Sequence, residues 1–307
     1  MIIAPRTDAN IVSTNIAQIE AGIAVYDSTV AYALKNVVQV NGTTNRIYEA
    51  TQAVPAGTDP VLDVNPTTGI GIYWFDRGAT NYMRAFDALE SSKCSNSDSI
   101  YYKFAISDID TLMIDGLVNA TSIRVVLTNN ATSTVILDET TDITSRIVYD
   151  WFDWTYAPTE KQKSFFKLFV PIFDATLEIY IIGTGSVVGV GHIAYGRSMN
   201  YGLSLISPSP VSSMRGLTSK KRDAYGNIIT RRKARYKRMK ISCVIDSFSV
   251  DVIEQRLNDL ADTPSIFVGD ERDGGYRALL IYGELKDHDM PISVSKTRYQ
   301  LEVEGYL

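Results

Sequence analysis

Cysteine is nearly absent from this chain, which restricts both its cross-links and its metal chemistry. Only Cys94 and Cys243 occur in 307 residues, too few for a disulfide framework or a Cys-x-x-Cys metal site. Residues 1–6 show no basic region followed by an apolar run, so we expect no secretory signal. The two cysteines are therefore expected to be free thiols in a protein made in a reducing compartment.

Histidine is equally scarce, and neither copy indicates a metal site. His192 lies in a glycine-rich strand pattern and is expected to be structural or at the surface. His288 stands between Asp287 and Asp289, but neighbouring residues on an extended strand point to opposite faces and rarely converge on one ion. The sequence therefore predicts no metal ion and no other cofactor.

Long apolar runs and catalytic motifs are missing as well. No window approaches the roughly 18 apolar residues of a membrane span, so we expect no membrane insertion. The segment 183–189 lacks the lysine and the helix of a phosphate loop and is expected to be a hairpin. Asp76, Asp87 and Glu90 lie close in sequence, but this density of carboxylates is common in globular proteins and does not by itself indicate a glycosidase. Without a nucleophile elbow or zinc-protease helix motif, the chain is predicted not to be an enzyme.

Residues that favour strands are abundant. The chain has 18 tyrosines, and threonine, valine and isoleucine dominate many windows. Alternation is clearest where Leu177, Ile179 and Ile181 are separated by other side chains. Strands are expected at residues 99–106, 111–114, 121–128, 134–138, 164–173, 175–182 and 186–195. Short strands at this spacing predict a mainly β fold whose main body is a jelly-roll-like β-sandwich.

The remaining patterns divide the chain into four parts. Residues 1–72 are expected to form an extended N-terminal arm with a small β element, in which Asn41-Gly42 predicts a hairpin turn. The sandwich follows at 73–206, and a basic connector with two Ser-Pro pairs occupies 207–234.

A smaller α+β domain is predicted at 235–307. Ser249 is expected to cap a helix that ends before Pro264, because four apolar residues share one helical face there. Those residues are Val250, Ile253, Leu257 and Leu260. The final strand alternates apolar residues with charged and amide side chains at 298–304, which predicts one buried face.

Positive charge is concentrated in one short band. Residues 219–240 hold 10 lysines and arginines against 1 acidic residue, although the net charge of the chain is −5. The segments on both sides, residues 1–218 and 241–307, each have a net charge of −7, which works against generic binding of nucleic acid. We expect the band to dock against an acidic patch of a neighbouring subunit. A solvated segment is the second reading, and a grip on nucleic acid is the least favoured because few aromatic residues are interleaved. The candidate residues are Lys220, Lys221, Arg222, Arg231, Arg232, Lys233, Arg235, Lys237 and Arg238.

Aromatic, charged and amide side chains gather in residues 73–87. The stretch suits a buried structural junction, a subunit contact, or a sugar site in which Trp74 and Tyr82 stack on rings. We expect the structural junction, with Arg77 and Arg84 pairing with the two aspartates of the stretch. The candidate residues are Trp74, Asp76, Arg77, Asn81, Tyr82, Arg84 and Asp87.

Two sets of residues occur in an order that is familiar from one protein family. The first is Trp74-x-Asp76-x-Gly78-x-Thr80-Asn81, closed by Phe86-Asp87. The second begins at Lys221-Arg222-Asp223-Ala224-Tyr225-Gly226-Asn227 and Arg231-Arg232, includes a helix ending near Thr263-Pro264, and runs from Ile281-Tyr282-Gly283 to Leu301-Glu302-Val303-Glu304-Gly305. Together they cover about half of the chain and resemble tail proteins of tailed bacteriophages and their prophages. Met83-Arg84-Ala85-Phe86 departs from the family, which more often has a tryptophan there.

This resemblance implies a virion component of the tail tip or baseplate that has no enzymatic activity. It would be made in the cytoplasm of the bacterial host and be present in several copies. Its expected partners are other tail proteins and copies of itself. A shorter likeness of Ile47-Tyr48-Glu49-Ala50, Pro55-x-Gly57 and Trp74 to chitin-binding-type modules implies the alternative, a module that binds a glycan of the host surface.

Overall fold

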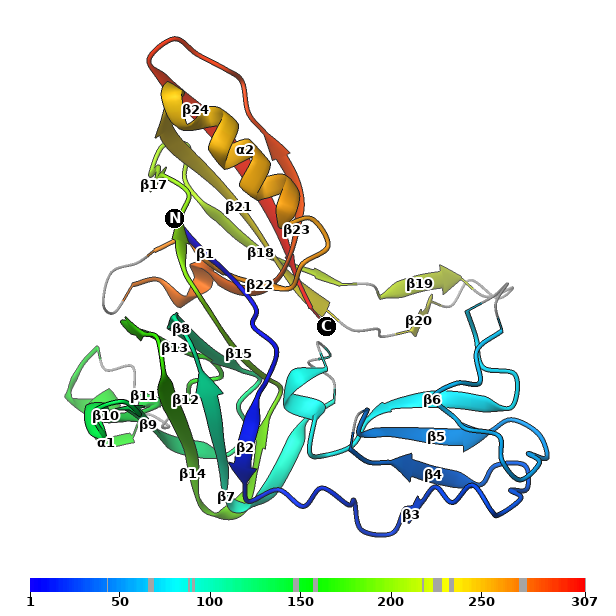
Figure 1. Ribbon diagram of the computed structural model, residues 1–307. Helices are drawn as coiled ribbons and strands as arrows, with labels where there is room; N and C mark the ends of the chain where they lie inside the picture. Colours follow the sequence, from blue (N-terminus) through cyan, green and yellow to red (C-terminus); the bar gives the residue numbers. More distant parts are fainter. Residues whose placement is uncertain are drawn as a thin grey trace.

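The computed structural model describes residues 1–42, 44–65, 69–87, 89, 92–145, 149–156, 160–216, 218–222, 228–231, 235–270 and 275–306. Within them the fold is mainly β, and nearly all strand pairs are antiparallel. Most strands form a layered body, from which a small sheet and two thin projections extend (Figure 1).

Two sheets of the body face each other across a common core. The first contains, in spatial order, β10 (Thr134–Asp142), β9 (Ala120–Asn129), β14 (Ala175–Val190), β7 (Cys94–Ile106) and β2 (Ile11–Thr14). The second contains β13 (Phe165–Ile172), β8 (Ile109–Asp115) and β15 (His192–Gly196). Hydrophobic side chains of both sheets form one buried cluster. The predicted strands overlap these elements, and the alternation at Leu177, Ile179 and Ile181 is confirmed.

A third, eight-stranded sheet and the helix that packs on it add two further layers. Seven of its strands follow in the order β16 (Met199–Asn200), β1 (Ile2–Pro5), β22 (Ser265–Val268), β23 (Leu280–Asp289), β24 (Lys296–Gly305), β21 (Arg235–Asp246) and β17 (Leu203–Ser204). The eighth, β18 (Val211–Gly216), pairs with β21. Helix α2 (Val250–Asp259) buries Ile253 and Leu257 against this sheet. The helix and the final strand therefore have the buried faces that their periodicity predicts.

Strands β8 and β15 of the three-stranded sheet are buried on both faces because they lie between the other two sheets. Leu112 and Ile114 face the five-stranded sheet, whereas Met113 and Ala194 contact residues of the eight-stranded sheet. All five residues of β15 are consequently buried. The body thus has four layers, in the order α2, eight-stranded sheet, three-stranded sheet and five-stranded sheet.

The strand pairings do not follow the predicted division at residues 72, 206 and 234. β1 pairs with β22, with Ile2 opposite Val268, so the first residues of the chain belong to the sheet of the C-terminal strands. Within the predicted connector, β18 pairs with β21, with Val211 opposite Lys240. These long-range pairings have no local sequence signal, because each strand finds its partner only in the folded body.

A small sheet lies beside the body (Figure 1). It has the order β3 (Ala24–Val25), β4 (Val37–Val40), β5 (Arg46–Ala50) and β6 (Trp74–Ala79). β4 and β5 form the hairpin predicted from Asn41-Gly42, with Val40 opposite Arg46. This sheet has its own small hydrophobic cluster, separate from that of the body.

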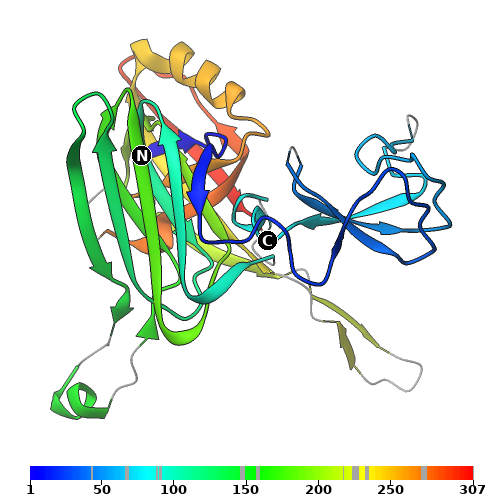
Figure 2. The same ribbon diagram turned by 60° about the horizontal axis from the view of Figure 1, so that its bottom comes forward.

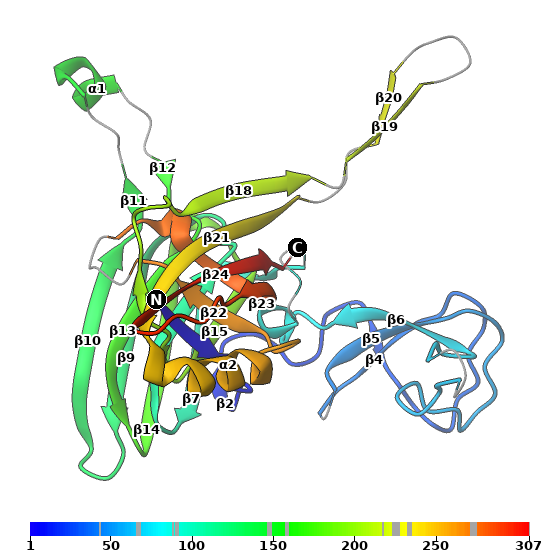
Figure 3. The same ribbon diagram turned by 90° about the horizontal axis from the view of Figure 1, so that it is seen from above.

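Two thin projections leave the body and diverge, one toward the left and one toward the right of the views in Figures 2 and 3. One is the hairpin of β19 (Ser219–Arg222) and β20 (Ile228–Arg231), which pair only with each other among the described strands. The other carries helix α1 (Trp151–Tyr156) beyond the paired β11 (Thr144–Ser145) and β12 (Glu160–Lys161). Three short 3-10 turns complete the structure: η1 (Arg84–Phe86), η2 (Ser247–Ser249) and η3 (Arg277–Leu279).

Two local expectations were wrong. Residues 183–189 do not form a hairpin, since β14 continues through them with a register shift between Ile182 and Val187. Gly185 takes a left-handed φ of 63° there, which a glycine allows within an irregular strand. Ser249 precedes α2 but makes no side-chain cap, because it ends η2 and already has helical φ and ψ angles. No helix in the described part of the chain is long and apolar enough to cross a membrane.

Candidate functional site

Trp74 belongs to the core of the small sheet and is not available as a stacking platform. It is 2% exposed, and its ring contacts those of Tyr26 and Tyr32 edge-on, at centroid distances of 6.2 and 5.3 Å. Its indole Nε1 donates a hydrogen bond of 3.1 Å to the carbonyl of Thr58. The sugar site predicted around this residue therefore loses its main ring.

The charged residues that follow Trp74 join β6 to β5. Asp76 pairs with Arg46 at 2.7 Å and Arg77 pairs with Glu49 at 3.6 Å. Gly78 has a φ of 109° at an irregularity of this pairing, where a side chain would be strained. The expected pairing of Arg77 with an aspartate of the same stretch was wrong, because the facing strand β5 offers Glu49.

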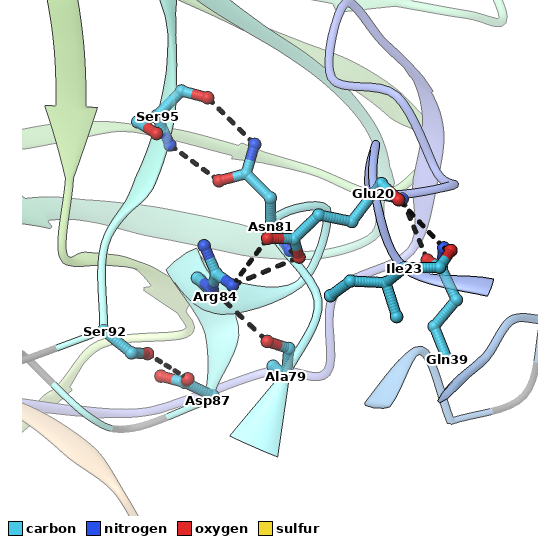
Figure 4. Close-up of polar contacts among 9 residues, drawn as sticks. All are labelled: Glu20, Ile23, Gln39, Ala79, Asn81, Arg84, Asp87, Ser92 and Ser95. Atoms are coloured by element: carbon cyan, nitrogen blue, oxygen red, sulfur yellow. Dashed lines mark hydrogen bonds and ion pairs between the residues drawn. The ribbon is translucent and has the colours of Figure 1, made fainter. Parts of the chain in front are cut away.

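A polar cluster lies where the small sheet meets the body (Figure 4). The side-chain amide of Asn81 donates to the carbonyl of Ser95 and accepts from its backbone N–H, both at 2.9 Å. Arg84 pairs with Glu20 at 2.9 Å, and Glu20 also accepts from the backbone N–H of Asn81 at 3.0 Å. Arg84 was expected to pair with Asp76 or Asp87. It pairs instead with Glu20, a residue of the N-terminal segment.

Gln39 supports this cluster from β4, and nothing in the sequence singled it out. It is fully buried. Its carbonyl accepts from the backbone N–H of Glu20 at 2.8 Å, and its amide donates to the carbonyl of Ile23 at 2.6 Å. A glutamine within the apolar run Val37–Val40 was the one signal of a buried polar role.

Tyr82 and Asp87 lie at the edge of the same junction. Tyr82 is half-buried against the core of the body, and burial raises the pKa of its hydroxyl. Burial also raises the pKa of Asp87, whose carboxylate accepts hydrogen bonds from Ser92 and from the backbone N–H of Leu89. Glu90, the third carboxylate considered for catalysis, lies outside the described residues.

An open cleft of about 450 Å³ runs beside Asp87. Its charged lining comes from Arg77, Arg84, Asp87 and Lys93, and two of these are already held in the ion pairs described above. The lining that the structure describes brings no second carboxylate next to Asp87. Among the described residues, the cleft thus shows no pair of carboxylates of the kind that glycoside hydrolysis uses.

The basic band divides into an outer and an inner part. Lys221, Arg222, Arg231 and Arg235 are exposed on or next to the β19–β20 hairpin. Lys220 lies in β19, while Arg232 and Lys233 lie outside the described residues.

The inner residues of the band, in β21, are engaged inside the molecule. Lys237 donates to the carbonyls of Arg277 and Leu280 at 3.0 and 2.7 Å, and burial lowers its pKa. Arg238 pairs with Glu302, which Lys240 also contacts at 2.8 Å. Lys237 and Arg238 thus use their charges within the eight-stranded sheet, and the docking role expected of the whole band stays a prediction.

A cluster of exposed aromatic side chains lies on the second projection, outside the stretches that the sequence motifs singled out. We call residues 149–156 the aromatic arm. Its aromatic residues are between 60% and 88% exposed, namely Tyr149, Trp151, Phe152, Trp154 and Tyr156. Asp150 accepts from the backbone N–H groups of Phe152 and Asp153, both at 2.9 Å, and so closes the turn on itself. The signal was present as five aromatics in an eight-residue stretch without strand alternation.

Three of the four histidine and cysteine side chains are buried. His192 is buried between sheets, and neither ring nitrogen has a hydrogen-bond partner among the described residues. Burial, together with nearby Arg6 and Lys93, lowers its pKa to about 4. Cys94 and Cys243 are buried, and neither takes part in a disulfide. Within the described chain, no three acidic, histidine or cysteine side chains are placed to hold a metal ion.

Comparison with known proteins gives no further assignment. No family model, no curated protein and no solved structure matches the chain. The likeness to tail proteins therefore rests on the two sets of sequence motifs.

Proposed function

We propose that this chain is a structural subunit of a bacteriophage tail, at the tail tip or baseplate, and that it acts in virion assembly by docking against other subunits. The motifs at 74–87 and 221–305 support the tail assignment. The observation that carries the docking role is the aromatic arm, whose five rings are exposed on a projection of the fold. Tryptophan and tyrosine are the residues that most often dominate the energy of protein–protein contacts.

In this proposal the layered body is a scaffold. The two sheets with a common core form a jelly-roll-like β-sandwich, and the eight-stranded sheet with α2 is the α+β domain that docks neighbours. The junction of Asn81, Arg84 and Glu20 holds the small sheet in a defined position on this scaffold. Such a scaffold presents its projections at fixed points, which specific assembly requires.

Glycan binding is less well supported. Its best ring, Trp74, is buried in the small sheet, and Asp76 is held by Arg46. The open cleft beside Asp87 would have to bind a sugar without a fully exposed ring from the predicted set. Docking accounts for the exposed aromatic arm, and a sugar site at the junction leaves it without a role.

Deletion of the gene from the phage or prophage that encodes it tests the proposal. We expect particles whose tails are absent or incomplete, with normal tails restored by the wild-type gene supplied in trans. Electron microscopy of purified particles and counts of infectious units report the outcome. Complete tails and normal infectivity without the protein would overturn the proposal, whereas complete tails that no longer adsorb to cells would replace it with glycan binding.

A further inference from the structure

The two projections of the fold diverge from the body and point away from each other (Figures 1, 2 and 3). The aromatic arm extends to one side and the β19–β20 hairpin to the other in all three views (Figures 1, 2 and 3). A single copy therefore cannot bring its own arm to its own hairpin. Two copies placed side by side can do so, because the arm of one then points toward the hairpin of the next.

The described part of the aromatic arm combines rings with negative charge. Its carboxylates are those of Asp150 and Asp153, and it contains no lysine or arginine between residues 149 and 156. The rings of Phe152 and Tyr156 contact each other at a centroid distance of 4.8 Å. A surface of this kind suits arginine, whose guanidinium stacks on aromatic faces while it pairs with carboxylates.

The hairpin provides the opposite chemistry. Lys221, Arg222, Arg231 and Arg235 are exposed, and none of them forms an ion pair with another described residue. The antiparallel register places Arg222 opposite Ile228 and Ser219 opposite Arg231. Cations at both ends of a two-stranded ribbon can contact a partner over its whole length. The unpaired state of these cations distinguishes them from Lys237 and Arg238, which are used internally.

We infer that the aromatic arm of one copy docks on the β19–β20 hairpin of a second copy. The inference rests on the proposed assembly role and specifies one of its contacts. The contact is heterologous, so each copy keeps a free arm or a free hairpin until a ring closes or a filament grows. Opposite charges orient the approach, and the aromatic rings supply the affinity.

Two double variants separate the halves of this contact. Tyr149→Ala with Trp151→Ala removes rings that are 88% and 77% exposed, so the fold should be retained. Arg222→Glu with Arg231→Glu reverses the charge of the hairpin. The matched controls are Phe173→Ala, an exposed ring elsewhere, and Lys296→Glu with Arg298→Glu, two exposed cations of β24. Sedimentation velocity over a range of protein concentrations measures self-association, and circular dichroism checks folding.

Wild-type protein and both controls should sediment as species larger than a monomer, and added salt should weaken their association. Each double variant alone should associate at least about 10-fold more weakly. An equal mixture of the two should form a dimer and nothing larger. The hairpin variant still has a wild-type arm, and this arm can dock on the wild-type hairpin of the arm variant. This mixing result is specific to a head-to-tail contact.

Three results would overturn the inference. They are a wild-type protein that stays monomeric at all concentrations, a variant that associates as well as wild type, and a mixture that stays monomeric. None of these results contradicts the proposed function, since a monomer can still join a tail through other proteins. Conversely, complete tails without the protein would remove the tail assignment while leaving a measured self-association intact.

Discussion

Replacing Trp74 by alanine should unfold the small sheet and leave the body folded. Trp74 is the largest side chain in a cluster whose other fully buried members are Val38, Tyr48, Ala50 and Val54. It also contacts the rings of Tyr26 and Tyr32. No residue of this cluster is shared with the clusters of the body. The stability of the small sheet therefore depends on very few side chains.

The expected loss of unfolding free energy is comparable to the whole stability of the small sheet. Truncation of a buried tryptophan to alanine costs about 3–5 kcal/mol. Loss of the indole leaves the carbonyl of Thr58 without its hydrogen-bond donor, which adds about 1 kcal/mol. The sum is comparable to the whole stability of a small domain, about 5 kcal/mol at the lower end of the usual range. Since the body has a separate and larger core, the loss should stay local.

Hydrogen exchange read by mass spectrometry can locate the loss. In Trp74→Ala, amides of β4 and β5 should exchange at the rate of an unfolded chain, while amides of β7 and β14 keep their protection. Trp151→Ala is the matched control, because Trp151 is 77% exposed and should leave both sets unchanged. Protection of β4 and β5 in Trp74→Ala, or its loss throughout the body, would show that Trp74 does not hold the small sheet as a separate unit.

Three further predictions concern the junction, the buried histidine and the hairpin. Asn81→Ala removes two hydrogen bonds to Ser95 and should lower the free energy of unfolding by about 2 kcal/mol, as measured with urea; an unchanged midpoint would contradict the role given to Asn81. His192 has its pKa lowered from 6.5 to about 4, so the unfolded chain binds the proton more readily. Stability should be full above pH 6.5 and fall by about 3 kcal/mol as the pH drops towards 4. His192→Phe should flatten that part of the profile, and an equally steep profile would show that other groups cause it. Lys221→Glu with Arg222→Glu should leave the melting temperature unchanged but prevent tail assembly in the complementation assay; normal assembly would remove the hairpin from the docking surface.

Local periodicity was sufficient for the elements that bury one regular face. Leu177, Ile179 and Ile181 repeat every second residue, and Val250, Ile253 and Leu257 repeat at helical spacing, so burial of one face follows directly. The mainly β character and the α2 helix could therefore be predicted from the sequence. The same reasoning located the β4–β5 hairpin from its turn residues.

The remaining features depend on contacts that are distant in sequence. The pairing of β1 with β22 joins residues more than 250 positions apart and has no local pattern. Residues 94–98, at the start of β7, are mostly small and polar, and they extend the strand because the end of β14 pairs with them. Arg84 pairs with Glu20, and Arg77 pairs with Glu49. Both partners are close in the folded structure but distant in sequence, so nearness in sequence predicted the wrong partners.

A reconstruction of the tail by electron cryomicroscopy can show where this chain lies and what its aromatic arm contacts. We expect density for the chain at the tail tip or baseplate, in several copies, with Trp151 and its neighbours buried at a contact between subunits. Absence of the chain from the purified tail would contradict the proposed function. Its presence with the aromatic arm exposed to solvent in every copy would contradict the docking role that the exposed rings support.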